Sequence, residues 1–344
     1  MSKLEITIVY SNLPNSYVAF EDERARITYS DKKIFGTHNV GVNWYSIPNP
    51  DPDDSILIIE PRCVNEKDYN FDYVSRYNKI FTWAVKAFEH MSLHDKVVEV
   101  NYYSVSYTDP DYLRKNWLPW KLKSNEVVFV ANNKTSKHPS ELYSLRMGLA
   151  DYLSNYTKFK VSWYGNSFVP KPYYRGKLDT NNKIETLKSA RFSICCENSY
   201  DPIFSYNFFS EKMPDVLLAG TIPLYMGCYN IDSFNIPPYL DLRRFVQKEG
   251  RYYNIDCPGL VKAMEEYDDA KYEDFLNKVE ANLRDPYGLH YIADVKRVYN
   301  KIIETFSPKE EMPVEEKMLP IVEEMPMAEE STGEEICPQH VLQE

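Results

Sequence analysis

Apolar and polar residues follow two periods along this chain, and the two periods alternate. Short apolar runs typical of buried strands occur at residues 4–10, 56–60 and 97–105, and a more helical pattern covers residues 81–93. Strands that alternate with helices are typical of α/β domains with a parallel sheet. The first third of the chain is therefore predicted to be an α/β domain.

The alternation resumes after a polar, tryptophan-containing stretch at residues 109–124, where we place a domain boundary. Strands are predicted at 126–131, 159–164, 190–196 and 221–226, helices at 140–155, 183–190 and 210–220, and two closing amphipathic helices at 259–282 and 289–305. This order of βα units predicts a second, Rossmann-like domain. The predicted domains are residues 1–124 and 125–307.

From residue 308 onward the composition changes to glutamate, methionine and proline, and the motif Glu-Glu-Met-Pro occurs at 310–313 and again at 323–326. Such a segment buries too little apolar surface to offset the entropy cost of ordering it. Residues 308–344 are therefore predicted to be a disordered acidic tail. The alternative is a segment that binds an unknown partner or tethers the protein.

The net charge of the chain comes mostly from this tail. The formal charge is −11, and the 11 acidic residues and two lysines of the tail contribute −9 of it. A nearly neutral remainder argues against a large basic face for nucleic acid. The six cysteines are scattered without a Cys-x-x-Cys pair, which is typical of reduced thiols. No signal peptide and no apolar run of about 18 residues is present, so we expect a cytoplasmic protein without a membrane span.

The most informative stretch is residues 191–227. An apolar strand delivers a polar cluster at residues 197–199, and in open α/β sheets ligands bind at that end of the strands. Ser210 then suits the cap of a helix whose first turn is charged, and Gly220 suits its end. A strand, a polar loop and a charged helix start in this order predict a ligand site.

The ordered motifs of this stretch resemble the signature of the α-1,3-fucosyltransferases, glycosyltransferase family ten. The matching residues are Cys196-Glu197-Asn198-Ser199, Phe209-Ser210-Glu211-Lys212, Ala219-Gly220-Thr221-Ile222-Pro223 and Gly227. The resemblance implies a GT-B-type fold of two facing Rossmann-like domains, with the acceptor on the first and GDP-fucose on the second. It also implies an inverting enzyme that moves fucose to a glycan hydroxyl without an essential metal or cofactor. Without an N-terminal anchor, the chain resembles microbial or viral members.

The resemblance implies a set of residues around the donor. Lys212 lies in the first turn of a predicted helix, where the helix dipole favours an anion. Arg146, followed by Leu153 seven residues later, resembles the family's phosphate-binding arginine, and an always-charged guanidinium suits that role. Glu211 resembles the glutamate that contacts donor hydroxyls, and Asn198 lines the same pocket. The alternatives are a solvated helix face for Arg146 and a helix-start acid for Glu211.

The sequence departs from the family pattern between Asn198 and Glu211. Twelve residues separate them, more than in the family, and the usual tyrosine is Phe208. A phenyl ring packs against a nucleotide but donates no hydrogen bond, and Tyr206 is a candidate to replace the lost hydroxyl. The alternatives to GDP-fucose transfer are the same fold with another nucleotide-sugar donor, or a non-catalytic nucleotide- or glycan-binding protein.

Glu60 ends a predicted strand and is followed by proline, and the resemblance implies that it deprotonates the acceptor hydroxyl. The alternative is that it caps the next loop. Asp51-Pro-Asp53 resembles an Asp-x-Asp metal motif, but its flanking prolines predict a turn ahead of the strand. His90 and His94 lie one helical turn apart without an obvious third ligand. No metal site is predicted.

Overall fold

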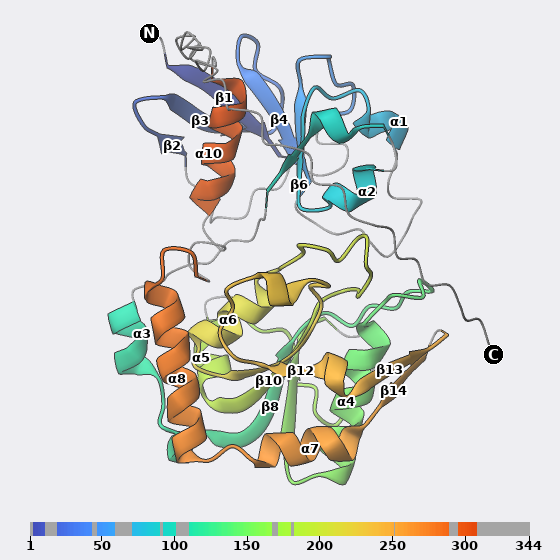
Figure 1. The fold of residues 1–344 in the computed structure, drawn as a ribbon, viewed down its shortest axis with the longest axis vertical. Coiled ribbons are helices and arrows are strands. Elements are labelled where there is room, and N and C mark those ends of the chain that lie inside the picture. Colours follow the sequence, from blue (N-terminus) through green and yellow to red (C-terminus); the bar gives the residue numbers. More distant parts are fainter. Residues whose placement is uncertain are drawn as a thin grey trace, which may run out of the picture. The chain divides into compact units, whose positions relative to one another are not determined.

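The computed structural model describes residues 3–10, 19–42, 47–58, 71–89, 92–100, 110–166, 171–179, 182–250, 252–288 and 295–307. These residues form two mostly parallel β-sheets, surrounding helices and one β-hairpin (Figure 1). The first sheet uses strands up to residue 99 and the second begins at residue 124. The predicted α/β fold with a sheet in each half is confirmed. Residues 308–344, the predicted tail, lie outside the described ranges.

The first sheet has seven strands in the order β2-β3-β1-β4-β5-β6-β7. They are β1 (Leu4–Val9), β2 (Phe20–Glu21), β3 (Ala25–Ser30), β4 (His38–Val42), β5 (Ser55–Ile58), β6 (Ile80–Thr82) and β7 (Val97–Glu99). Neighbouring strands are parallel except β2 and β3. Parallel strands covered on both faces are apolar along their length. Accordingly, residues 6–9 of β1 and all of β5 are buried.

Among the described residues, three α-helices belong to this sheet: α1 (Phe71–Val74), α2 (Val85–Glu89) and α10 (Val295–Phe306). The prediction had placed the last helix with the second half of the chain. Figure 1 shows α10 beside β1, β3 and β4, and the buried residues of the helix share a core cluster with these strands. These buried residues are Val298, Tyr299, Ile302 and Ile303. The apolar stripe of a helix shows which face is buried, but not which sheet covers it.

The predicted helix at residues 81–93 was partly wrong. Ile80–Thr82 forms strand β6 between β5 and β7, and the helix α2 that follows has five residues. Ile80, Phe81 and Thr82 are β-branched or aromatic, so they fit a central strand once both neighbouring strands are in place. Pairing across the sheet therefore overrode the local helical pattern.

The second sheet has five strands in the order β12-β11-β10-β8-β9, and all the predicted strands in it are confirmed. They are β8 (Ser124–Val130), β9 (Lys160–Tyr164), β10 (Ala190–Cys196), β11 (Ile222–Met226) and β12 (Leu240–Asp241). Around them lie α3 (Pro110–Asn116), α4 (Tyr143–Tyr156), α5 (Lys183–Lys188), α6 (Lys212–Leu218), α7 (Cys257–Glu265), α8 (Asp269–Arg284) and the hairpin β13 (Val246–Glu249) and β14 (Tyr252–Ile255). The predicted single helix at 259–282 is two helices, because Asp268 caps a new one by accepting from Lys271 N.

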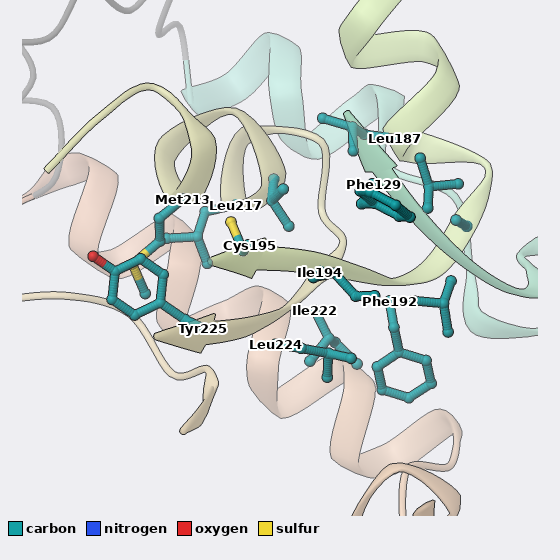
Figure 2. Close-up of a cluster of buried hydrophobic side chains, with 14 of the residues drawn as sticks. Phe129, Leu187, Phe192, Ile194, Cys195, Met213, Leu217, Ile222, Leu224 and Tyr225 are labelled. Atoms are coloured by element: carbon teal, nitrogen blue, oxygen red, sulfur yellow. The ribbon is translucent and has the colours of Figure 1, made fainter. Parts of the chain in front are cut away.

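Strand β10 lies at the centre of the second core and is buried along its length apart from its second residue. Figure 2 shows Met213 and Leu217 of α6 on the side of Cys195, and Phe192 on the opposite side of the strand. Burying an apolar side chain of this size contributes about 2 kcal/mol. These contacts hold α6 against β10, so the start of the helix stays near the end of the strand.

Candidate functional site

The site begins where β10 and β11 end. These parallel strands pair Cys196 with Met226, so both chains leave the sheet at the same edge. The next residue after β10, Glu197, donates its backbone N–H to the Met226 carbonyl at 2.8 Å. The carboxyl edge of an open parallel sheet is where ligands bind in this class of fold. The structure thus places the polar cluster of residues 197–199 at the expected edge.

Glu197 is the most deeply buried charged group of this edge, with none of its surface exposed. Its carboxylate accepts from Ser210 N at 3.0 Å, from Ser210 Oγ at 2.7 Å and from Lys212 Nζ at 3.0 Å. Gly227 leaves room for it, because a Cβ at that position would lie 2.2 Å from Glu197 Cγ. A buried charge is tolerated only when it is paired and hydrogen-bonded, and this one is both.

Lys212 is the first residue of α6, and its ammonium also donates to Ser210 Oγ at 2.8 Å. Burial acts to lower the pKa of Lys212, but the nearby carboxylates of Glu197 and Glu211 outweigh burial, and the pKa is raised. The side chain therefore stays positively charged at neutral pH. The guanidinium of Arg146 acts in the opposite direction on the same group, so the two cations lie close enough to interact.

Arg146 lies in the first turns of α4 and is 4% exposed. Its Nη2 donates to the Glu197 carbonyl and, at 3.0 Å, to Asn198 Oδ1. Within the described part of the chain, Arg146 Nε has no hydrogen-bond partner. The guanidinium is therefore held at the end of β10 with one buried N–H group unpaired. The predicted residues Arg146, Asn198 and Lys212 are brought together.

The start of α4 is fastened to the same strand end. Glu141 accepts from Ser144 N at 3.0 Å, which satisfies one of the free N–H groups of the first turn. Leu142 N donates to the Asn198 carbonyl at 3.0 Å. This bond ties the helix start to the signature loop, so the position of Arg146 follows from the position of the loop.

Glu211 lies beside the site but in a different environment from Glu197. Its side chain is 49% exposed, and Lys183 Nζ lies 3.8 Å from its Oε1 and 2.5 Å from Asp215 Oδ2. The positive charges of Lys212 and then Lys183 lower the pKa of Glu211 to about 2, against the effect of burial. It is therefore an ionised, accessible carboxylate next to two lysines.

Phe208 is buried against the other half of the chain. Its ring centroid lies 5.0 Å from that of Trp83, within the core cluster of the first sheet. The same loop is anchored again where Trp83 Nε1 donates to the Phe204 carbonyl at 3.3 Å, and Lys86 Nζ lies 3.5 Å from the ring centre of Tyr206. The extra loop residues thus make packing contacts with the first sheet. The predicted contact of Phe208 with a nucleotide stays a prediction.

The remaining predicted residues lie outside this cluster. Glu60, the predicted base, falls outside the described ranges, as does His90. Asp51 is paired with Lys33 at 2.5 Å, and His94 with Asp95 at 3.0 Å. Within the described ranges, no group of three or more His, Cys, Asp or Glu residues is placed to hold a metal ion, and no helix has the length and apolar composition to cross a bilayer.

The contacts that Glu197, Ser210 and Lys183 make in this site were not predicted from the sequence. Glu197 carried a signal, since a carboxylate directly after a buried strand ends up at the ligand edge. Ser210 was expected to cap a helix; instead it bridges Glu197 and Lys212. The pairing of Lys183 with Asp215 has no sequence signal, because it depends on how α5 and α6 pack.

No family model matches the chain. The curated alpha-(1,3)-fucosyltransferase FucT of Helicobacter pylori is 24% identical to it over 187 residues, which cover 48% of this chain and 38% of that protein. The chain thus matches well under half the length of this relative. This match confirms the resemblance to the α-1,3-fucosyltransferases.

Two solved structures are similar in fold. A crystal structure of α1,3-fucosyltransferase with GDP-fucose has a TM-score of 0.51 and 17% identity, covering 90% of this chain and 91% of the other. An α-glucosyltransferase in complex with UDP and a 13-mer DNA has a TM-score of 0.52 and 11% identity, covering 77% and 79%. The chain therefore has the GT-B fold of glycosyltransferases, and its sequence resembles the α-1,3-fucosyltransferases.

Proposed function

We propose that the protein is an inverting glycosyltransferase that moves fucose from GDP-fucose to a hydroxyl group of a glycan. The observation that carries the proposal is that two cations, the buried Arg146 and the partly exposed Lys212, lie together at the carboxyl edge of the second sheet. The sequence match to an α-1,3-fucosyltransferase and the fold shared with a GDP-fucose complex support it.

The chemistry requires stabilisation of a leaving nucleoside diphosphate. Within the described residues, two of the three N–H donors of Lys212 bind Glu197 and Ser210, which leaves one for a phosphate oxygen. Arg146 keeps its Nε–H for a second oxygen. With Glu197 ionised, the three side chains carry a net charge of about +1, which favours an anion. Donors aimed at developing charge each contribute about 3 kcal/mol to catalysis.

Two further side chains complete the proposed donor site. Asn198 accepts from Arg146 through Oδ1, so it orients the guanidinium, and its amide N–H groups make no hydrogen bond to another described residue, which leaves them for the donor. Glu211 is ionised and half exposed, so it suits the hydroxyl groups of ribose or fucose. We place the acceptor on residues 1–124 and the donor on residues 125–307.

For the base we propose Glu60, which follows β5 by two residues and takes the proton of the acceptor hydroxyl as it attacks the sugar. Attack from the face opposite the leaving diphosphate inverts the anomeric centre. The transition state resembles an oxocarbenium ion, as in glycoside hydrolysis. In this proposal Arg146 and Lys212 stabilise the negative charge of the leaving diphosphate, and no resident metal or cofactor is required.

The test compares GDP binding with transfer. Arg146→Ala and Lys212→Ala should each weaken GDP binding measured by calorimetry, whereas Glu60→Gln should abolish fucose transfer and leave GDP affinity nearly unchanged. Unchanged GDP affinity in both cation variants would refute the donor site. The enlarged loop at residues 200–208 favours one alternative, another nucleotide-sugar donor, and a thermal-shift panel of nucleotide sugars separates the two. Binding of GDP without any transfer would identify a binding protein instead.

A further inference from the structure

The hairpin of β13 and β14 lies beside helix α4, which carries Arg146 (Figure 1). Its strands pair from Val246 with Ile255 to Glu249 with Tyr252. Ile255 faces the helix, because a Cβ at Gly148 of α4 would lie 3.9 Å from its Cδ1. Residues two apart on a strand lie on the same face, so Tyr253 also faces α4.

The hydroxyl group of Tyr253 is buried and, within the described ranges, has no hydrogen-bond partner. Its ring packs against the core of the second sheet. Burial raises the pKa of Tyr253, and the charges of Glu141 and Cys196 add to the effect. Glu141 caps the start of α4 and Cys196 ends β10, so the hydroxyl lies near the two elements that hold Arg146.

Among the residues that the structure describes, two buried donors near α4 therefore lack an acceptor, the hydroxyl of Tyr253 and the Nε–H of Arg146. An unmade hydrogen bond on a buried polar group is costly, and most such groups in native proteins have a partner. The two oxygens of Glu141, whose charge acts on Tyr253, already accept from the backbone N–H and the hydroxyl of Ser144. A ligand with several acceptor oxygens would supply the partners that these two donors lack among the described residues.

We propose that Tyr253 is a donor-site residue whose hydroxyl donates a hydrogen bond to the diphosphate of the nucleotide that Arg146 binds. This inference rests on the proposed function, since it takes a nucleoside diphosphate as the ligand. The hairpin then forms a wall of the site over the start of α4. A phosphate oxygen accepts from an arginine and a hydroxyl at once, because it has several lone pairs and a negative charge.

Tyr253→Phe tests the inference by removing one oxygen atom and leaving the ring in place. The matched control is Tyr252→Phe, which changes the neighbouring tyrosine of the same hairpin, 81% exposed. Calorimetry with GDP, inorganic pyrophosphate and guanosine separates diphosphate contacts from nucleoside contacts. We expect Tyr253→Phe to weaken GDP and pyrophosphate binding about tenfold, as for a hydrogen bond to a charged group, and to leave guanosine binding unchanged. The control should match the wild type throughout.

The melting temperature without ligand should not fall in Tyr253→Phe, because the variant removes a buried hydroxyl that lacks a partner. Wild-type GDP affinity in this variant, or an equal loss for guanosine and GDP, would overturn the inference. The same measurements are made with UDP. If the wild-type protein binds UDP and not GDP, the proposed donor is refuted, but the inference about Tyr253 can still be tested, because Tyr253→Phe should then weaken UDP binding about tenfold. A wild-type protein that binds neither nucleotide nor pyrophosphate overturns both proposals.

Discussion

Replacing Glu197 by glutamine removes one charge from a buried ion pair and keeps the shape of the side chain. The Glu197 side chain is fully buried and that of Lys212 is 17% exposed, with 3.0 Å between Oε2 and Nζ. Removing one partner of a buried pair costs about 3–5 kcal/mol, because the other charge is left uncompensated. The amide oxygen of glutamine still accepts one N–H, so we expect a loss of about 3 kcal/mol in the free energy of unfolding.

The same variant should respond more strongly to GDP than the wild type does. Without the carboxylate, the ammonium of Lys212 lacks its buried counter-charge, and a phosphate of the donor supplies one. A ligand that binds only the folded state raises stability by an amount that grows with its affinity. Glu197→Gln should therefore start from a lower melting temperature, by about 5 °C for a chain of this size, and show a larger shift with saturating GDP.

Urea unfolding followed by circular dichroism, with and without GDP, measures both effects. The matched control is Glu185→Gln, since Glu185 pairs with Lys188 at 2.7 Å but is 67% exposed. Exposed pairs are worth about 0–1 kcal/mol, so this control should resemble the wild type. Two results would refute the reasoning: stability of Glu197→Gln equal to that of the control, or a smaller GDP shift than in the wild type.

Three further predictions address the packing around the site and the core beneath it. Gly227→Ala places a Cβ 2.2 Å from Glu197 Cγ, so it should lower both the melting temperature and the affinity for GDP. The control is Gly148→Ala, whose Cβ lies at an ordinary van der Waals distance of 3.9 Å from Ile255 Cδ1 and should lower neither. Burial lowers the pKa of Lys123 to about 7, whereas a lysine in an unfolded chain has a pKa of about 10.4. Between these two pH values the unfolded state binds more protons than the folded state, so the free energy of unfolding rises with pH, by up to about 1.4 kcal/mol per pH unit. Urea unfolding at pH 7, 8 and 9 should show this slope in the wild type and lose it in Lys123→Met; equal slopes would contradict the burial argument. Phe208→Ala should lower the free energy of unfolding by about 3–5 kcal/mol through a cavity in the first core, and calorimetry with GDP shows whether the ring also contacts the nucleotide.

The predicted positions that the structure reproduces rest on local pattern, while the roles of the site residues stay predictions. Strand β10 is an apolar run, and the carboxyl end of such a strand is a known ligand edge, so Asn198 could be placed without coordinates. Lys212 begins the helix packed against that strand, and Arg146 lies on a helix whose start is bonded to the same loop. Their meeting follows from the βα order of the second half.

The predictions that failed, or that were never made, depend on distant contacts. The stripe of α10 is visible in the sequence, but its partner sheet begins near residue 4. The loop that carries Phe208 packs on Trp83, and the bond from Trp83 to Phe204 spans 121 residues. The unpaired hydroxyl of Tyr253 depends on a hairpin that was not foreseen. Local periodicity contains no information about such pairings.

Because α10 lies in the core of the first sheet, the two halves of this protein are completed in the reverse of the order in which they are synthesised. The strands of the second sheet and the helices α7 and α8 end by residue 284, whereas the residues that cover β1 and β3 begin at Val298. Domains generally fold as their sequence emerges from the ribosome. We expect chains stalled at residue 290 to be protease-resistant in the second half and sensitive in the first, which remains an open sheet until the last helix is made.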